Sequence, residues 1–259
     1  MPLTYGRYLQ LDELLDLQRP LSDGPEHDEH LFIVIHQVYE LWFKQILHEL
    51  ARLQQVFEAN DTPAVLATFK RILTILKILV AQVDILETMT PVSFTSFRSR
   101  LQAASGFESW QFREVEFVLG HRRKAMIEHH SDTPHGARLL RRASEPSLYA
   151  SFLAYLAAQG HSIPPDCLRR DPSLPPVEDE RVRETLVRVY HHHPTAREVC
   201  ERMVDLDEGF QEWRYRHVKM VERTIGTKAG TGGSSGAEYL RNTLFQPLFP
   251  DLWAIRSAL

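Results

Sequence analysis

The segment from His27 to Asn60 constrains the fold most, because its apolar residues recur at helical spacing over its whole length. Within its first half, from Leu31 to Phe43, apolar residues stand on nearly every side of such a helix, which is typical of a helix buried on most faces. Asp28 and Glu29 in the first turn suit the positive end of the helix dipole. The sequence therefore predicts a long central helix that other helices cover.

Two further long helices are predicted by the same spacing. One follows Asp61, with Pro63 at a position that suits the first turn, and continues to about Met89. The other covers Pro194 to Gly226 and carries a run of apolar residues: Val199, Met203, Leu206, Phe210, Trp213, Met220 and Val221. Shorter helices are expected near the N-terminus, at 92–101, 107–120, 148–159 and 181–192, and from 238. Residues 121–147 show only a weak pattern with many charges, and 163–177 are expected to form a loop.

No internal repeat and no run of alternating strands occurs, so the predicted fold class is all-α. We expect one domain over residues 1–259, a helical bundle built on the three long helices. Because 30 Lys and Arg stand against 34 Asp and Glu, the charge does not point to nucleic acid. The best apolar run, Ile72 to Val83, contains Lys77 and is too short to cross a bilayer. Cys167 and Cys200 lack CxxC spacing, and no signal peptide is apparent, so a reducing cytoplasm is expected.

Two histidines stand among apolar residues at helical spacing, and two interpretations are open for each. His36 is either a packed core residue or a group that faces a pocket, with Phe32 one turn earlier on the same face. A neutral imidazole there could accept a proton or bind an N–H group. His217 has Trp213 and Val221 one turn away on either side. It is either packed in the core or the axial ligand of a haem, which needs an imidazole between apolar walls.

Arg98 shares a helix face with Phe94, and it is either a surface residue or a group whose planar fork grips a carboxylate. A glycine-rich segment at 228–236 contains a formal match to the G-x-S-x-G elbow of hydrolases. That elbow follows a strand and is followed by a catalytic histidine, whereas here no histidine follows His217. The segment also lacks the Gly-Lys-Ser/Thr of a phosphate loop. A mobile linker and a lid that supplies Thr231 remain as interpretations.

The other histidines give weaker signals for a metal site. His27, His30 and the run 191–193 lie at expected helix ends, where solvated side chains are common. His48-Glu49 is not followed by the second histidine of a zincin motif, and no Glu-x-x-His pair of the di-iron type occurs. We therefore expect no metal centre other than haem iron.

Taken together, several segments resemble the tryptophan 2,3-dioxygenase family. They occur in the order of the family and spread over residues 3–240, and the match is least clear at 121–194. The segments are Leu3 to Leu9, His27 to Gln37, Glu40 to Lys44, Phe97-Arg98, Ser105 to Phe107, Trp213 to His217 and Gly230 to Gly236.

The resemblance implies haem b, buried between helices, as cofactor and O2 as co-substrate. It implies that His217 is the proximal iron ligand and that His36 is the distal catalytic histidine, which meets the indole N–H. Arg98 would pair with the substrate carboxylate and Thr231 with the ammonium group. The remaining implied contacts are an indole pocket lined by Phe32 and Phe94, and a haem environment of Ser105, Gly106 and Trp213.

The resemblance also implies a homotetramer, a dimer of dimers. In such an assembly the N-terminal helix, within residues 1–20, packs on a neighbouring subunit, and Tyr5, Tyr8 and Leu9 reach into that subunit's pocket. No nucleic acid or membrane partner is implied.

The implied reaction is the addition of O2 across the indole C2–C3 bond of L-tryptophan, which gives N-formyl-L-kynurenine in tryptophan catabolism by the kynurenine pathway. Three positions depart from the family pattern: Tyr39 stands where a small residue is common, Glu108 replaces a frequent Gln, and Phe94 is Tyr in some members. Tyr39 and Phe94 could reshape the pocket. An alternative is therefore a haem monooxygenase of the same family that acts on a substituted tryptophan, such as β-methyltryptophan to a 2-oxindole, in natural-product biosynthesis. A haem-binding sensor without turnover is a third possibility.

Overall fold

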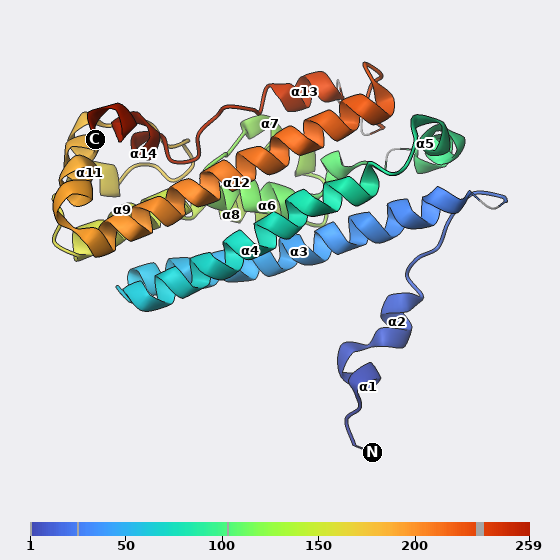
Figure 1. Cartoon of the computed structure of the whole chain (residues 1–259), viewed down its shortest axis with the longest axis horizontal. Coiled ribbons are helices and arrows are strands. Elements are labelled where there is room, and N and C mark those ends of the chain that lie inside the picture. Colours follow the sequence, from blue (N-terminus) through green and yellow to red (C-terminus); the bar gives the residue numbers. More distant parts are fainter. Residues whose placement is uncertain (1, 25, 103, 232–235) are drawn as a thin grey trace.

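A computed structural model describes residues 2–24, 26–102, 104–231 and 236–259, and within these ranges the chain is helical without strands (Figure 1). The helices are α1 Tyr5–Leu9, α2 Leu11–Leu15, α3 His27–Glu58, α4 Thr62–Leu86, α5 Pro91–Arg98, α6 Trp110–Leu119, α7 Lys124–His130, α8 Gly136–Ser144, α9 Leu148–Ala158, α10 Pro165–Leu168, α11 Glu180–His192, α12 Pro194–Ile225, α13 Ala237–Arg241 and α14 Pro250–Ala254. Short 3-10 helices are η1 Ser99–Leu101, η2 Gly106–Glu108 and η3 Ile255–Ala258. The predicted all-α class is confirmed.

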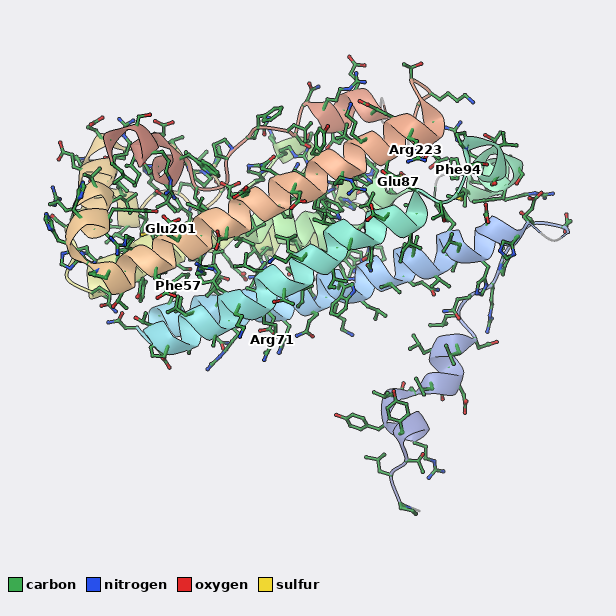
Figure 2. The ribbon with its side chains drawn as sticks, viewed as in Figure 1. Phe57, Arg71, Glu87, Phe94, Glu201 and Arg223 are labelled. Carbon is green, nitrogen blue, oxygen red and sulfur yellow. The ribbon has the colours of Figure 1, made fainter. Side chains whose placement is uncertain are left out.

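The three long helices are those that the apolar spacing predicts, and α4 lies beside both α3 and α12 (Figure 1). The axes of α4 and α12 come close because Gly209 of α12 has no side chain. A Cβ atom at this position would lie 2.7 Å from Cδ2 of Leu76 on α4. At the far end of the same interface, Glu87 forms an ion pair with Arg223 of α12 at 3.5 Å (Figure 2). It forms a second ion pair with Arg216 of α12 at 3.4 Å.

Shorter helices close the remaining sides of the bundle. α6 and α9 pack on α3, and α8 packs on α6. The C-terminal segment is fastened to α12 by the fully buried Asp207, whose Oδ2 accepts from the backbone N of Leu248 at 2.8 Å and of Phe249 at 3.2 Å. The same oxygen accepts from Nε1 of Trp253 at 2.8 Å. This carboxylate replaces the water that the two buried backbone donors would otherwise need.

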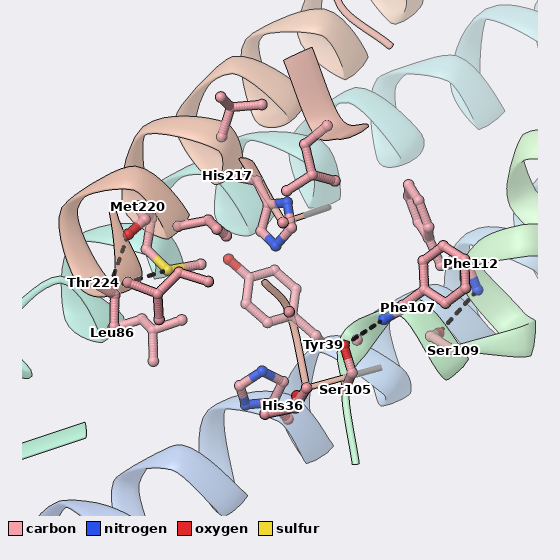
Figure 3. A pocket seen from close by; sticks show the side chains of 18 of the residues that line it. His36, Tyr39, Leu86, Ser105, Phe107, Ser109, Phe112, His217, Met220 and Thr224 are labelled. Atoms are coloured by element: carbon pink, nitrogen blue, oxygen red, sulfur yellow. Dashed lines mark hydrogen bonds between the residues drawn. The ribbon is translucent and has the colours of Figure 1, made fainter. Parts of the chain in front are cut away.

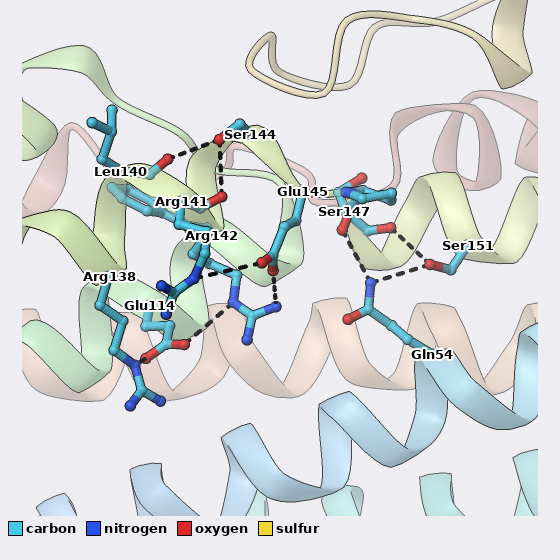
Figure 4. Close-up of polar contacts among 12 residues, drawn as sticks. Gln54, Glu114, Arg138, Leu140, Arg141, Arg142, Ser144, Glu145, Ser147 and Ser151 are labelled. Atoms are coloured by element: carbon cyan, nitrogen blue, oxygen red, sulfur yellow. Dashed lines mark hydrogen bonds and ion pairs between the residues drawn. The ribbon is translucent and has the colours of Figure 1, made fainter.

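Residues 121–147, where the sequence shows only a weak pattern, form α7 and α8. Leu139 and Ala143 of α8 form a small apolar cluster with Phe117 of α6. Ion pairs add to this contact, because the buried carboxylate of Glu114 on α6 accepts from Arg138 at 2.7 Å and from Arg142 at 3.2 Å (Figure 4). Arg142 also pairs with Glu145. Helices this short, with few apolar positions and many charged ones, leave little apolar periodicity to detect. The expected loop at 163–177 likewise contains one short helix, α10.

The predicted N-terminal helix is present as two short helices, α1 and α2, separated by Gln10 with a φ of 52°. They extend away from the bundle, and none of their residues is buried (Figure 1). None of the helices in the described ranges combines the length and the apolar character that a membrane span needs.

Candidate active site

A cavity of about 220 Å³ lies toward the end of the bundle where α5 and α13 are found. Side chains from α3, α4, α6 and α12 line it (Figure 3). Residues of α5 and α13 and the segments at 104–107 and 230–231 complete the lining. The cavity brings together most of the residues that the sequence singles out: Phe32, His36, Phe94, Arg98, Ser105, Gly106, Trp213, His217 and Thr231. Residues 232–235 of the glycine-rich segment lie outside the described ranges.

His36 reaches the cavity from α3, and its hydrogen bond determines which ring nitrogen carries the proton. Nδ1 lies 2.7 Å from the carbonyl oxygen of Phe32, which can only accept, so Nδ1 is the protonated nitrogen. Burial lowers the pKa of His36, which keeps the ring neutral. Nε2 is therefore unprotonated and free to accept a hydrogen bond from an N–H group.

His217 lies on the opposite side of the cavity, on α12 (Figure 3). Burial, and then the nearby His36, Arg113 and Arg214, lower the pKa of His217 to about 4. The imidazole is thus neutral near pH 7, and one nitrogen carries a free lone pair, as a metal ligand requires. Its ring stacks on Trp213 with a centroid distance of 5.3 Å and an interplanar angle of 4°.

A cluster of charged side chains borders the same cavity. The buried carboxylate of Glu116 on α6 accepts from Arg113 at 2.6 Å, from Arg214 at 2.7 Å and from Arg123 at 2.9 Å. Burial alone would raise the pKa of Glu116, but the three guanidinium charges outweigh it and hold this pKa at about 2. One carboxylate faces three cations, and the Nε atoms of Arg113 and Arg214 have no partner among the described residues. The surplus positive charge suits further carboxylates.

Arg98, the last residue of α5, and Thr231 lie on a side of the cavity that consists largely of loop segments. Nη2 of Arg98 donates to the carbonyl of Ala229 at 2.5 Å, and Oγ1 of Thr231 donates to the carbonyl of Ala104 at 2.9 Å. Ser105 caps the short turn beside them by accepting from the backbone N of Phe107 at 3.2 Å. The two side chains to which the resemblance assigns substrate contacts thus line the same cavity. Each binds a backbone carbonyl, and a substrate could replace that carbonyl.

The predicted aromatic pair is also in place, since the rings of Phe32 and Phe94 lie 5.8 Å apart. Tyr5, Tyr8 and Leu9 do not line this cavity; they are exposed on the N-terminal segment, Tyr5 by 76% and Tyr8 by 71%. Their contact with the pocket of a neighbouring subunit, which the resemblance implies, therefore stays a prediction.

Comparison with known proteins decides the family. A model of the family described as tryptophan 2,3-dioxygenase matches residues 1–157 and 182–259. The chain is 59% identical to the tryptophan 2,3-dioxygenase of Herpetosiphon aurantiacus over 99% of this chain and 98% of that protein. It is 59% identical to that of Anaeromyxobacter sp. (strain K) over 99% and 96%, and 44% identical to that of Kineococcus radiotolerans over 98% and 91%. The chain belongs to the tryptophan 2,3-dioxygenase family.

Membership confirms the resemblance and makes the protein an enzyme of an oxygenase family, which implies the use of haem and O2. The family model leaves out residues 158–181, a stretch that includes α10 and lies within the part of the sequence where the resemblance is least clear.

The cavity of this tryptophan 2,3-dioxygenase family member fits a haem in its donor chemistry. His217 offers a neutral imidazole from a helix, the walls around it are mainly apolar, and the cluster around Glu116 offers cations for the two carboxylates of the macrocycle. The cationic cluster is the feature that sequence reasoning missed. The only available signal was Arg214 beside Trp213, and the spacing of Arg113 and Glu116 by three residues on one helix.

Two of the three departures from the family pattern line the cavity, and one does not. Tyr39 lines it, and its hydroxyl donates to the carbonyl of Leu79 at 2.8 Å. Phe94 lines it as well, whereas Glu108 lies outside the lining and contacts Nε2 of His129 at 2.9 Å. Outside the cavity, the described residues bring together one group of potential metal ligands, Asp166, Cys167 and Asp179, and Arg181 binds both carboxylates of this group.

Proposed function

We propose that this protein is a haem-dependent dioxygenase that adds O2 across the indole C2–C3 bond of L-tryptophan and gives N-formyl-L-kynurenine. The observation that carries the proposal is the placement of two neutral histidines, His36 and His217, on opposite sides of one mainly apolar cavity. An arginine and a threonine hydroxyl border the same cavity. The relatives, which are tryptophan 2,3-dioxygenases by name, give independent support.

In this proposal His217 holds the iron of haem b, with Trp213 beside its ring and with Ser105 and Gly106 at the edge of the same cavity. The guanidinium groups around Glu116 balance the carboxylates of the macrocycle. When bound, the haem supplies ferrous iron that activates O2 for transfer to the substrate. The protein supplies binding, orientation and the exclusion of water.

The substrate is held at three points. Nε2 of His36 accepts the indole N–H, because its other nitrogen is committed to the carbonyl of Phe32. Arg98 leaves the carbonyl of Ala229 and takes the carboxylate with its planar fork. Thr231 meets the ammonium group. Three fixed points orient a zwitterion in one way, so the indole C2–C3 bond is presented in a single pose beside the neighbouring rings of Phe32 and Phe94.

We further propose that residues 1–259 act as one domain in a cytoplasmic homotetramer involved in tryptophan catabolism. The exposed rings of Tyr5 and Tyr8, with Leu9, fit a contact with a second subunit. Two free, buried cysteines suit a reducing compartment. Removing residues 1–16 should lower the oligomeric state measured by analytical ultracentrifugation; an unchanged mass would contradict this role of the segment.

Turnover in labelled O2 tests the reaction. L-tryptophan and β-methyltryptophan are supplied separately to the ferrous enzyme, and the product masses are measured. Two labelled oxygen atoms in the product of L-tryptophan support the dioxygenase. A single labelled atom, with β-methyltryptophan as the better substrate, would replace it with the monooxygenase, and haem binding without any product would indicate a sensor.

A further inference from the structure

We propose that Tyr39 and Trp213 are positioning residues for His217: Tyr39 holds Trp213 in place, and Trp213 sets the rotation of the His217 ring by parallel stacking. The inference rests on the proposed function, in which His217 binds the haem iron. It assigns a role to Tyr39, which departs from the family pattern, and a mechanical role to Trp213.

The first step concerns how the His217 ring is oriented. A histidine that binds a metal usually donates its second ring N–H to a carboxylate, a backbone carbonyl or water, which fixes the plane of the ring. Among the described residues, none forms a hydrogen bond with the imidazole of His217. Its directional protein contact is Trp213, one helical turn earlier on α12, with the two rings 4° from parallel and their centroids 5.3 Å apart. Such an offset stack constrains rotation of the smaller ring.

The second step concerns how Trp213 is itself held. Its indole is 7% exposed and lies among four other aromatic rings that come from three helices. Phe112 of α6 is 5.0 Å away at 48°, and Phe43 of α3 is 6.1 Å away at 89°. Phe210 lies one turn earlier on α12 at 6.2 Å, and Tyr39 lies 6.3 Å away at 65°. The indole cannot turn unless some of these rings move, because interiors are close-packed.

The third step distinguishes Tyr39 from the other rings around Trp213. Its ring contacts Trp213 edge to face, while its hydroxyl donates to the carbonyl of Leu79 on α4 at 2.8 Å. The side chain is therefore fixed at both ends. Burial raises the pKa of Tyr39 to about 12, so the hydroxyl keeps the proton that it donates. Because Tyr39 follows His36 by three residues on α3, one side chain connects the helix of His36 with the ring that supports His217.

The test uses the full-length, haem-loaded protein and three variants of graded severity. Tyr39→Phe removes only the hydroxyl, Tyr39→Leu removes the ring, and Trp213→Phe leaves a smaller surface beside His217. The matched control is Tyr155→Phe, which also removes a buried hydroxyl and its hydrogen bond, here to Oγ1 of Thr62 at 2.7 Å, away from the cavity lining. The readouts are the iron–histidine stretching band of the ferrous protein, the haem-to-protein ratio and the melting temperature.

We expect the iron–histidine band to shift and broaden in Trp213→Phe and Tyr39→Leu, and to broaden less in Tyr39→Phe. The control should lower the melting temperature by about as much as Tyr39→Phe while its band matches the wild type. Changes in the groups that orient a metal ligand typically reduce metal affinity or activity by about 10–100-fold. We expect a decrease in haem affinity of that size in Tyr39→Leu and Trp213→Phe.

A wild-type band in both Tyr39→Leu and Trp213→Phe would overturn the inference. If those two variants fail to fold, a band in Tyr39→Phe that cannot be distinguished from that of Tyr155→Phe would overturn it equally. Failure of the proposed function looks different. The wild-type protein would then show no iron–histidine band, or His217→Ala would retain it.

Discussion

The cavity has two unlike walls. The helix wall, formed by α3, α6 and α12, carries the two histidines, and around His217 it holds side chains such as Trp213, Arg214 and Glu116, which are at most 7% exposed. The loop wall, formed by α5 and the segments at 104–107 and 230–231, carries Arg98 and Thr231. Each of these two side chains makes its one hydrogen bond among the described residues to a loop carbonyl.

The difference between the walls separates two tasks of the site, haem binding and substrate binding. The helix wall is built into the core of the bundle, so its geometry exists before any ligand binds. The loop wall consists of contacts that a zwitterionic substrate can replace one by one. Changes in the helix wall should therefore alter haem occupancy or global stability, whereas changes in the loop wall should alter substrate affinity and leave both unaffected.

The largest effect is expected from His217→Ala, which removes the proposed iron ligand from the helix wall. Stable haem binding should be lost, and activity with it, because no other histidine on α12 lines the cavity. The haem-to-protein ratio and the Soret absorbance after purification measure this. His48→Ala, at an exposed histidine of α3, is the control and should retain full occupancy. A His217→Ala protein with full haem and activity would mean that the ligand assignment is wrong.

Glu116→Gln should have the next largest effect, on stability. Among the described residues, it removes the one carboxylate that accepts from Arg113, Arg123 and Arg214, and it leaves two of these guanidinium groups deeply buried without a counter-charge. Losing one partner of a buried ion pair typically costs about 3–5 kcal/mol. Urea unfolding of the haem-free protein should show this loss, and bound haem should recover part of it.

The control for Glu116→Gln is Glu222→Gln. Glu222 also pairs with two cations, Lys219 and Arg241, but those side chains are more than half exposed. Solvent screens such pairs, so its unfolding curve should hardly change. Equal losses of stability in Glu116→Gln and Glu222→Gln would show that burial does not determine how much a charged pair contributes to stability.

Arg98→Ala tests the loop wall. The variant should weaken substrate binding by about 2 kcal/mol, roughly 30-fold in KM, because a charge-assisted bidentate contact is lost. Haem occupancy and the melting temperature should remain those of the wild type. Arg100→Ala, at a neighbouring residue whose guanidinium pairs with the exposed Asp23, should leave KM unchanged. A parallel loss of haem and substrate in Arg98→Ala would erase the distinction between the walls.

The sequence predicts the helix wall's backbone better than its electrostatics. Apolar spacing is enough for α3, α4 and α12, and a histidine within such spacing is enough to select His36 and His217 as candidates. The cluster around Glu116 could not be predicted, because packing of α6 against α12 joins residues that lie far apart in the chain. Local spacing offered Arg98 and Thr231 as possible binding groups but did not distinguish them from surface residues, and only the family resemblance favoured the binding role.

A smaller effect should appear as a pH dependence of stability that originates behind the helix wall. Burial, and then Arg214, lower the pKa of His121 to about 4 from its usual value of 6.5. Between these values the unfolded chain binds a proton that the folded protein does not, so stability falls as the pH drops through this window. The contribution is roughly 1–2 kcal/mol between pH 7 and pH 5.

Urea midpoints at pH 7 and pH 5, compared between the wild type and His121→Gln, isolate this contribution from that of the other titrating groups. The variant should lose less stability on acidification. The same pH dependence in both proteins would mean that His121 is protonated in the folded state, and that this side of the helix wall is more open to solvent than its packing indicates.

Thr231 should give the smallest effect and the sharpest test of how separate the two walls are. Thr231→Ala removes one neutral hydrogen bond, worth about 1 kcal/mol, so KM should rise roughly fivefold with no change in haem occupancy. Thr231→Ser keeps the hydroxyl and should retain most of the wild-type affinity. Because Arg98 and Thr231 both bind loop carbonyls and both turn to the substrate, their effects should not be additive in the double variant. Additive effects would mean that each residue meets the substrate independently, and that the loop wall is as preformed as the helix wall.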